Sequence, residues 1–186
     1  MIVLASQSPR RRSLMSKITN DFLTYVSDIN EHESYKLKDP LKIVRDISYR
    51  KAKKAKEAYP NDIILAAGTI VVLDNEILGK PDDKDDAIRM LKELSNKEHL
   101  VITGYTIINK DKELTSHVIS KVLFNPLSDE LIQRYVESGS PLDKAGAYGI
   151  QDNEHFPIIK SYEGSYENIV GFPTDEIKKD LEIIKK

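Results

Sequence analysis

The chain opens with MIVLASQSPRRRSLM, residues 1–15, and the predicted fold builds outward from this segment. Residues 2–5 are apolar and predict a buried strand, whereas residues 13–15 predict helix. Between them, Ser8 can cap a helix and Pro9 fits the first helical position, where its missing N–H costs nothing. The segment therefore predicts a strand, a tight turn and the N-terminus of a helix.

The predicted turn has the chemistry of an anion site. Unpaired backbone N–H groups and the positive end of the helix dipole point out of it. It also holds the hydroxyls of Ser6 and Ser8 and the guanidinium groups of Arg10 and Arg11, whose fork geometry matches phosphate. A solvated basic surface is the alternative, because a basic first turn opposes the dipole. Neither a P-loop nor a dinucleotide fingerprint is present.

Composition limits the class of protein. The 186 residues fit one domain or two closely packed lobes. Lys plus Arg number 28 against 30 for Asp plus Glu, so the net charge of −2 argues for neither nucleic acid nor a membrane as partner. The absence of cysteine excludes disulfides and thiolate zinc sites. The N-terminus lacks a charged start followed by an apolar run, so we expect no signal peptide. No apolar run approaches the roughly 20 residues of a membrane span. We expect a soluble, cytoplasmic protein.

Hydrophobic periodicity divides the rest of the chain into alternating strands and helices. We predict strands at 22–26, 63–67, 69–73, 76–78, 99–109 and 113–124, and a strand-like stretch from 158 to 172. Helices are predicted at about 40–58, 84–95 and 128–137 and after 174, with Asp39, Ser128 and Thr174 as caps. The long antiparallel hairpin 99–124 argues against a purely parallel sheet. The fold class is therefore α/β, or α+β with a mixed sheet, and a cleft between two lobes is the expected ligand site.

Four further features carry chemistry, each beside a structural alternative. Glu31 lies in an acidic loop that either ligates a divalent ion or is solvated. The basic second half of helix 40–58 forms a solvated face, or turns one lysine toward a phosphate. Gly68 marks a bulge or a close backbone approach to a ligand. Residues 143–151 form a tight turn with a short helix, or one wall of a ligand site.

If these segments converge with Lys80, they would form a triphosphate site. Arginines and lysines would hold the phosphates, carboxylates would bring in Mg²⁺ with its waters, and amide groups would read a base edge.

Several motifs occur in a fixed order along the chain: SQSPRRRSL at 6–14, Lys51-Ala52, Lys80-Pro81, DKAGAYGIQ at 143–151, and GSY at 164–166 with VGFP at 170–173. Together they resemble the Maf family of nucleoside triphosphate pyrophosphatases, over nearly the whole chain. The resemblance implies a single Maf-like domain over residues 1–186. It also implies the Maf/ITPase-like fold, with two lobes flanking a central cleft.

The resemblance further implies an activity and its substrates. Such enzymes hydrolyse nucleoside triphosphates between the α and β phosphates, with a divalent metal, Mg or Mn, and release a monophosphate and pyrophosphate. The intact AYGIQ block at 147–151 resembles the branch that prefers dTTP and UTP, and the family suggests a homodimer. The carried-over roles are phosphate binding for Ser6, Ser8, Arg10 and Arg11, metal proximity for Glu31, phosphate proximity for Lys51 and Lys80, and nucleotide specificity for Arg10, Thr69 and Gln151.

Gly68 departs from the family pattern. The family places an Asp at this position as the base that activates water, and glycine cannot take a proton or bind a metal. A positioned general base contributes roughly 10²–10⁴-fold in rate. The chain is therefore either a pyrophosphatase in which Asp74, Asp82 or Asp143 substitutes, or a nucleotide-binding relative with weakened catalysis. The third hypothesis is a nucleic-acid-binding module that uses the lysine-rich helix. The nearly balanced net charge of the chain disfavours it.

Overall fold

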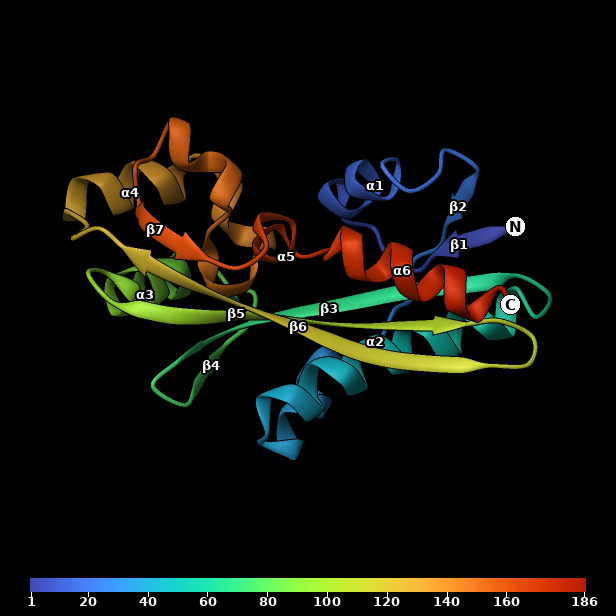
Figure 1. Ribbon diagram of the computed structural model, residues 1–186. Coiled ribbons are helices and arrows are strands. Elements are labelled where there is room, and N and C mark those ends of the chain that lie inside the picture. Colours follow the sequence, from blue (N-terminus) through green and yellow to red (C-terminus); the bar gives the residue numbers. More distant parts are fainter. The chain divides into compact units, whose positions relative to one another are not determined.

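The computed structural model describes residues 1–186 as two compact units (Figure 1). Unit 1 comprises residues 1–68, 103–118 and 171–186, and unit 2 comprises residues 69–102 and 119–170. Seven strands form one sheet in the order β2-β1-β3-β5-β6-β7, with β4 paired to β3.

The strands are β1 (Ile2–Leu4), β2 (Phe22–Thr24), β3 (Ile63–Leu73), β4 (Glu76–Leu78), β5 (Glu98–Ile108), β6 (Glu113–Phe124) and β7 (Ile159–Glu163). The α-helices are α1 (Pro9–Met15), α2 (Pro40–Ala58), α3 (Lys84–Leu94), α4 (Asp129–Glu137), α5 (Tyr166–Val170) and α6 (Thr174–Ile184). Four 3₁₀ helices complete the structure: η1 (Glu31–Leu37), η2 (Ser140–Asp143), η3 (Ala145–Ala147) and η4 (Ile150–Glu154). Strand β1 is parallel to β2 and β3, whereas β3–β4 and β6–β7 are antiparallel. The predicted mixed α/β class is confirmed.

In unit 1, helices cover both faces of the sheet. Successive residues of a strand point to opposite faces, and Gly104 and Tyr105 of β5 show this directly. Gly104 lies against Val44 of α2, whereas the Tyr105 hydroxyl donates to Asp180 of α6 at 2.6 Å. Helices α2 and α6 therefore lie on opposite faces (Figure 1).

Two glycines let α2 approach the sheet closely. A Cβ on Gly104 would lie 2.3 Å from the Val44 carbonyl oxygen, and a Cβ on Gly68 would lie 2.5 Å from Cγ2 of Ile47. Both distances are far shorter than a carbon contact of 3.5–4 Å. Gly68 thus sits in the middle of one unbroken strand, β3, and the predicted continuation of the strand from residues 63–67 into 69–73 is confirmed. Its close neighbour is Ile47.

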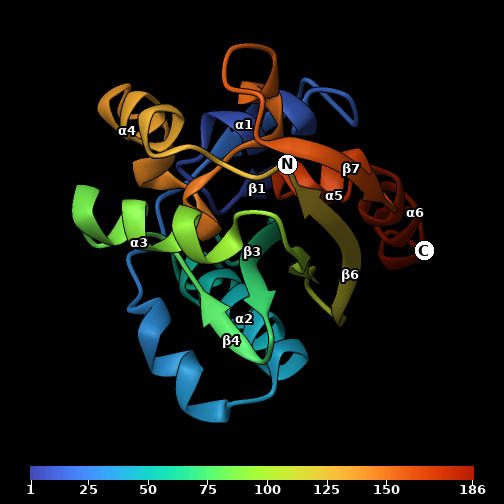
Figure 2. The ribbon, with the colours of Figure 1, turned by 90° about the vertical axis from the view of Figure 1, so that its left-hand side faces the viewer.

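Unit 2 has a separate hydrophobic core. Helix α3 buries Ala87, Met90, Leu91 and Leu94 in it. The β3–β4 hairpin pairs Val71 with Leu78 and Leu73 with Glu76 across its turn (Figure 2). The buried core holds every helix of this unit against its part of the sheet.

Most predicted helix starts are confirmed, and two predictions were wrong. Ser8, Asp39 and Ser128 cap α1, α2 and α4 by accepting backbone N–H groups. Thr174 is the first residue of α6, and it donates to the Phe172 carbonyl instead of capping. The stretch 158–172 is only partly strand, because 166–170 is the helix α5.

Candidate active site

The two serine side chains of the N-terminal turn form hydrogen bonds with the backbone of the turn itself. The hydroxyl of Ser6 accepts from the Ser8 amide at 3.1 Å, and the hydroxyl of Ser8 accepts from the Arg11 amide at 3.4 Å. The start of this turn is itself held by the sheet, because the Ala5 amide donates to the Leu65 carbonyl of β3 at 2.8 Å. Each hydroxyl oxygen keeps a lone pair and its own proton for a further hydrogen bond.

Arg11 is drawn into the protein, unlike the exposed Arg12. Its Nε donates to the Gly171 carbonyl at 2.9 Å, which ties α1 to the segment before α6. Burial lowers the pKa of Arg11 to about 10, Glu31 opposes this shift and Arg10 adds to it. The guanidinium therefore stays charged at neutral pH and lies within electrostatic reach of both Arg10 and Glu31.

Glu31 and Lys51 form a close ion pair. Lys51 Nζ lies 2.5 Å from Glu31 Oε1, and the two side chains are only 11% and 25% exposed. The pair joins η1 to the second half of α2. Glu31 also lies within electrostatic reach of Arg11, so one carboxylate of unit 1 acts on two cations.

The basic face of α2 holds the loop that carries Glu31. Arg50 Nε lies 3.0 Å from Asp46 Oδ2, its Nη2 donates to the Asn30 carbonyl at 3.0 Å and also to the Ser34 hydroxyl. Ser34 is buried and donates to Asp46 at 2.7 Å. On the same helix, Lys54 donates to the Asp28 carbonyl. The solvated face expected for this part of α2 is thus largely a clamp on residues 28–34.

In unit 2, two segments with predicted site residues are joined by a hydrogen bond. The Gly146 amide donates to the carbonyl of Gly79 at 3.1 Å, and Gly79 directly precedes Lys80. Gly146 also packs on Val71, two residues beyond Thr69, because a Cβ there would lie 2.7 Å from Val71 Cγ2. Strand β3, Lys80 and the glycine-rich loop therefore converge.

The glycine-rich loop rests on an aromatic cluster. His99 Nε2 lies 2.7 Å from the Tyr148 hydroxyl, and both rings pack edge-on against Phe124. His99 is 2% exposed, its Nδ1 has no hydrogen-bond partner, and burial lowers its pKa to about 3. The imidazole is therefore neutral at physiological pH.

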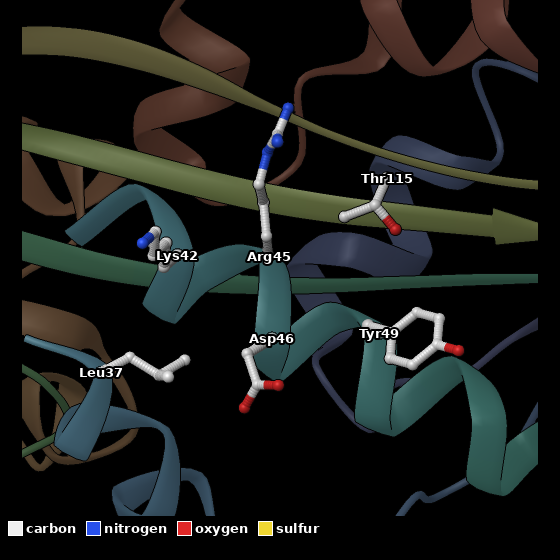
Figure 3. Close-up of a pocket in the computed structure, with 6 residues that line it drawn as sticks. All are labelled: Leu37, Lys42, Arg45, Asp46, Tyr49 and Thr115. Carbon is white, nitrogen blue, oxygen red and sulfur yellow. The ribbon is translucent and has the colours of Figure 1, made fainter. Parts of the chain in front are cut away.

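Two other structural features bear on ligands. No group of three or more His, Asp or Glu side chains comes together in a way that could hold a metal ion. A hollow of about 420 Å³ lies over the outward face of α2, where Arg45 and Asp46 point to different sides of the helix (Figure 3). It is lined by Leu37, Lys42, Arg45, Asp46, Tyr49 and Thr115, and no predicted site residue is among them.

No helix combines the length and the apolar character needed to cross a bilayer.

The family model for Maf-like proteins matches residues 1–184. This chain belongs to the Maf family. Among its relatives, the dTTP/UTP pyrophosphatase of Dictyoglomus turgidum is 45% identical, covering 92% of this chain and 90% of that protein. The dTTP/UTP pyrophosphatase of Pyrococcus furiosus is 44% identical (98% and 94% covered), and that of Acholeplasma laidlawii is 42% identical (100% and 99%).

A solved structure has a similar fold. The nucleoside-triphosphatase / dITP/XTP pyrophosphatase of Mycobacterium abscessus matches with a TM-score of 0.50 at 12% identity, covering 99% of this chain and 94% of that one. The Maf/ITPase-like fold expected from the motifs is thereby confirmed.

The predicted site residues of this Maf protein divide between the units. Unit 1 holds Ser6, Ser8, Arg10, Arg11, Glu31, Lys51 and Gly68, and unit 2 holds Thr69, Lys80 and Gln151. Within unit 1 the structure pairs Lys51 with Glu31 and places Arg11 within electrostatic reach of Glu31. Within unit 2, the side chains of Lys80 and Gln151 are exposed at the ends of the joined segments and form no hydrogen bond or ion pair.

Sequence reasoning missed Arg50. A charged residue on a basic helix face gives no local signal of a long-range partner. The acidic loop at residues 28–34 was the one available hint, because its backbone carbonyls and carboxylates need donors.

We expect Arg50→Met to lower the free energy of unfolding of this Maf protein by about 1–3 kcal/mol. Methionine keeps the stem but removes every donor, which leaves Asp46 and the buried Ser34 short of a partner. Urea unfolding measures the loss. Lys53→Met is the matched control, because Lys53 contacts only surface groups, the carboxylate of Glu113 and the ring of Tyr49, and its effect should be smaller. Equal losses for both variants would contradict the clamp.

Proposed function

We propose that this Maf protein hydrolyses dTTP and UTP to the monophosphate and pyrophosphate. The agreement among its relatives carries the proposal: proteins named dTTP/UTP pyrophosphatase are 42–45% identical to at least 92% of this chain. The block DKAGAYGIQ, residues 143–151, supports the same substrate branch.

The cations of unit 1 are proposed to bind the phosphates. Arg11 keeps its charge, and Lys51 pairs with Glu31, which lies within electrostatic reach of Arg11. Arg10 adds a second guanidinium in the same turn, and Ser6 and Ser8 supply hydroxyl donors. Charge-assisted bonds of this kind are about twice as strong as neutral ones and suit phosphate oxygens.

The divalent cation is proposed to enter as part of the substrate. Mg²⁺ is usually held by one or two carboxylates together with substrate phosphates and waters. No acidic cluster could hold it alone, and Glu31 is the predicted carboxylate near it. Because Lys51 already lies 2.5 Å from Glu31, binding of a metal–triphosphate complex would have to share or displace this pair.

Gln151 is proposed to read the base. Its carboxamide carries both a donor and an acceptor, which complement the carbonyl and N–H groups on the edge of uracil or thymine. The side chain is exposed and forms no hydrogen bond within the protein. Thr69 is assigned to the same specificity role, and the exposed Lys80 to the phosphates.

A nucleotide-binding relative with weakened catalysis is the second candidate. One observation favours it: Gly68 is buried against Ile47 and offers no carboxylate where the family pattern places the base.

Arg10→Ala tests the proposed phosphate grip. We expect the KM for dTTP to rise at least about tenfold, because one charge-assisted contact is worth roughly 1.5–3 kcal/mol, while the Tm changes little. Pyrophosphate release and thermal unfolding are the two measurements. Arg12→Ala is the control, since Arg12 is exposed on the same helix. A large fall in Tm with an unchanged KM would show that Arg10 is structural.

Four further expectations remain predictions. The family resemblance suggests a homodimer. The lack of a signal-peptide pattern and of a long apolar run predicts a cytoplasmic location, and the charge balance predicts that neither nucleic acid nor a membrane is a partner.

A further inference from the structure

The loop that carries Gln151 adopts an unfavourable backbone. Gly146 and Ala147 have φ values of +68° and +61°, so a non-glycine residue occupies the left-handed region. This conformation costs an L-residue roughly 1–2 kcal/mol. Ala147 and Tyr148 are buried, so surrounding contacts must hold the loop in this shape.

Tyr135 of α4 reaches both sides of Gln151 with one hydroxyl. The hydroxyl accepts from the Gly149 amide at 2.9 Å and donates to Asp152 Oδ2 at 2.7 Å. The Tyr135 side chain is fully buried, and its ring packs on Phe156 with centroids 4.8 Å apart. Burial, with a smaller effect of Asp152, raises the pKa of Tyr135 well above its usual value, so the hydroxyl keeps its proton.

Asp152 is held from a second direction. Ser140 donates its hydroxyl to the same Oδ2 at 2.7 Å, and Lys144 Nζ lies 3.9 Å away. Lys144 in turn donates to the carbonyl and the hydroxyl of Ser140 at 2.5 and 3.0 Å. The carboxylate therefore joins α4, η2 and the loop.

The side chain of Gln151 lies over Gly149, whose amide donates to the Tyr135 hydroxyl. A Cβ on Gly149 would be 3.1 Å from Gln151 Oε1 and 2.7 Å from Cε of Lys144. The carboxamide oxygen is thus packed against the Gly149 backbone, whose amide is fixed by Tyr135. Any movement of Gly149 or Asp152 would displace the carboxamide.

We propose that Tyr135 is a positioning residue for substrate choice: through Gly149 and Asp152 it fixes the carboxamide of Gln151 that reads the pyrimidine. The inference rests on the proposed function, in which Gln151 contacts the base. Tyr135 touches no substrate atom. It acts on selectivity by restricting the position of the residue that does.

The test compares kcat/KM for dTTP with that for dCTP, which differs in the base edge. Gln151→Ala sets the loss of discrimination when the carboxamide is absent. Tyr135→Phe keeps the buried ring and removes only the hydroxyl, and we expect it to lower the dTTP/dCTP ratio at least about tenfold, since small misplacements cost large factors in rate. In the double variant, Tyr135→Phe should cause no further loss.

Tyr105→Phe is the matched control, because Tyr105 is equally buried and also donates to a carboxylate, but in unit 1. It should leave the ratio unchanged. Asp152→Asn gives a second variant of the same network, and hydrogen exchange at the Gly149 amide should accelerate in Tyr135→Phe.

The outcomes separate the inference from the proposed function. If Gln151→Ala leaves the ratio unchanged, Gln151 does not read the base, and both statements fall. If Gln151→Ala lowers the ratio but neither Tyr135→Phe nor Asp152→Asn does, only the positioning role is overturned. A loss in Tyr135→Phe that persists in the Gln151→Ala background would also overturn it, because the hydroxyl would then act by another route.

Discussion

A Gly68→Asp variant is expected to release pyrophosphate from dTTP about 10²–10⁴-fold faster than the native chain, the range that a positioned general base supplies. Gly68 stands at the position where the family resemblance places a water-activating Asp, and it brings no side chain of its own. Initial rates with Mg²⁺ or Mn²⁺, under saturating nucleotide, measure the change.

The same substitution carries a steric cost. The new Cβ would lie 2.5 Å from Ile47 Cγ2 and 3.0 Å from Ile47 Cβ, and overpacking of this kind costs roughly 1–3 kcal/mol. Ile47→Leu moves the branch one carbon outward and keeps the volume. The double variant should therefore recover part of the stability while keeping the activity.

Gly68→Asn is the matched control for the base. It meets Ile47 in the same way but cannot accept the proton, so its rate should stay at the native level. Equal acceleration by Asn and Asp would rule out a base at position 68. A native chain that already turns over rapidly would show that another carboxylate takes the proton, and Asp74, Asp82 and Asp143 are the predicted substitutes. Binding without turnover in all variants would favour the nucleotide-binding relative.

Acid should destabilise the protein through His99. Its pKa is about 3 in the folded state because of burial, against 6.5 when unfolded. Between these values the unfolded chain binds a proton that the folded chain does not, so stability falls as the pH drops below 6.5. The loss is about 1.4 kcal/mol per pH unit and approaches its full size of roughly 5 kcal/mol below pH 3. That is comparable to the whole stability of many domains.

Urea unfolding between pH 7 and pH 4 measures this slope. His99→Gln keeps a polar group beside Tyr148 and removes the titration, so its slope should be shallower than that of the native chain. His155→Gln, at an exposed position, should leave the slope unchanged. An NMR titration that finds His99 protonating near pH 6.5 in the folded protein would contradict the prediction.

Local signals predicted much of the fold. Ser8, Asp39 and Ser128 were recognisable because capping depends on a short polar side chain next to an apolar period. The 166–170 segment was not, because its Tyr, Ile and Val favour strands. Its helix is fixed from outside, where the buried Asn168 donates to the Val101 carbonyl and to the Ser120 hydroxyl.

The candidate site likewise has a part that local sequence signals predict and a part that they do not. The motifs that bear Arg10, Lys51 and Gln151 are contiguous and visible in the sequence. The residues that hold them are distant in the sequence and look ordinary. Tyr135 occupies the apolar face of an amphipathic helix, where a phenylalanine would fit the pattern equally well. Its hydroxyl was the one available signal, because a buried phenol needs a hydrogen-bond partner.

The two glycines beneath α2 fix the position of that helix along its axis and its rotation about it. Gly68 and Gly104 lie on neighbouring strands and receive Ile47 and Val44, which are three residues apart on the helix. A slip of one residue would shift the helix by 1.5 Å and rotate it by about 100°, which would remove both contacts. Lys51 lies one turn beyond Ile47, so the two glycine contacts also determine where Lys51 lies along the sheet. A side chain added at Gly104 would meet backbone atoms of Val44 rather than a side chain, so it would move α2 as a whole, and with it Lys51, Arg50 and the loop that they hold.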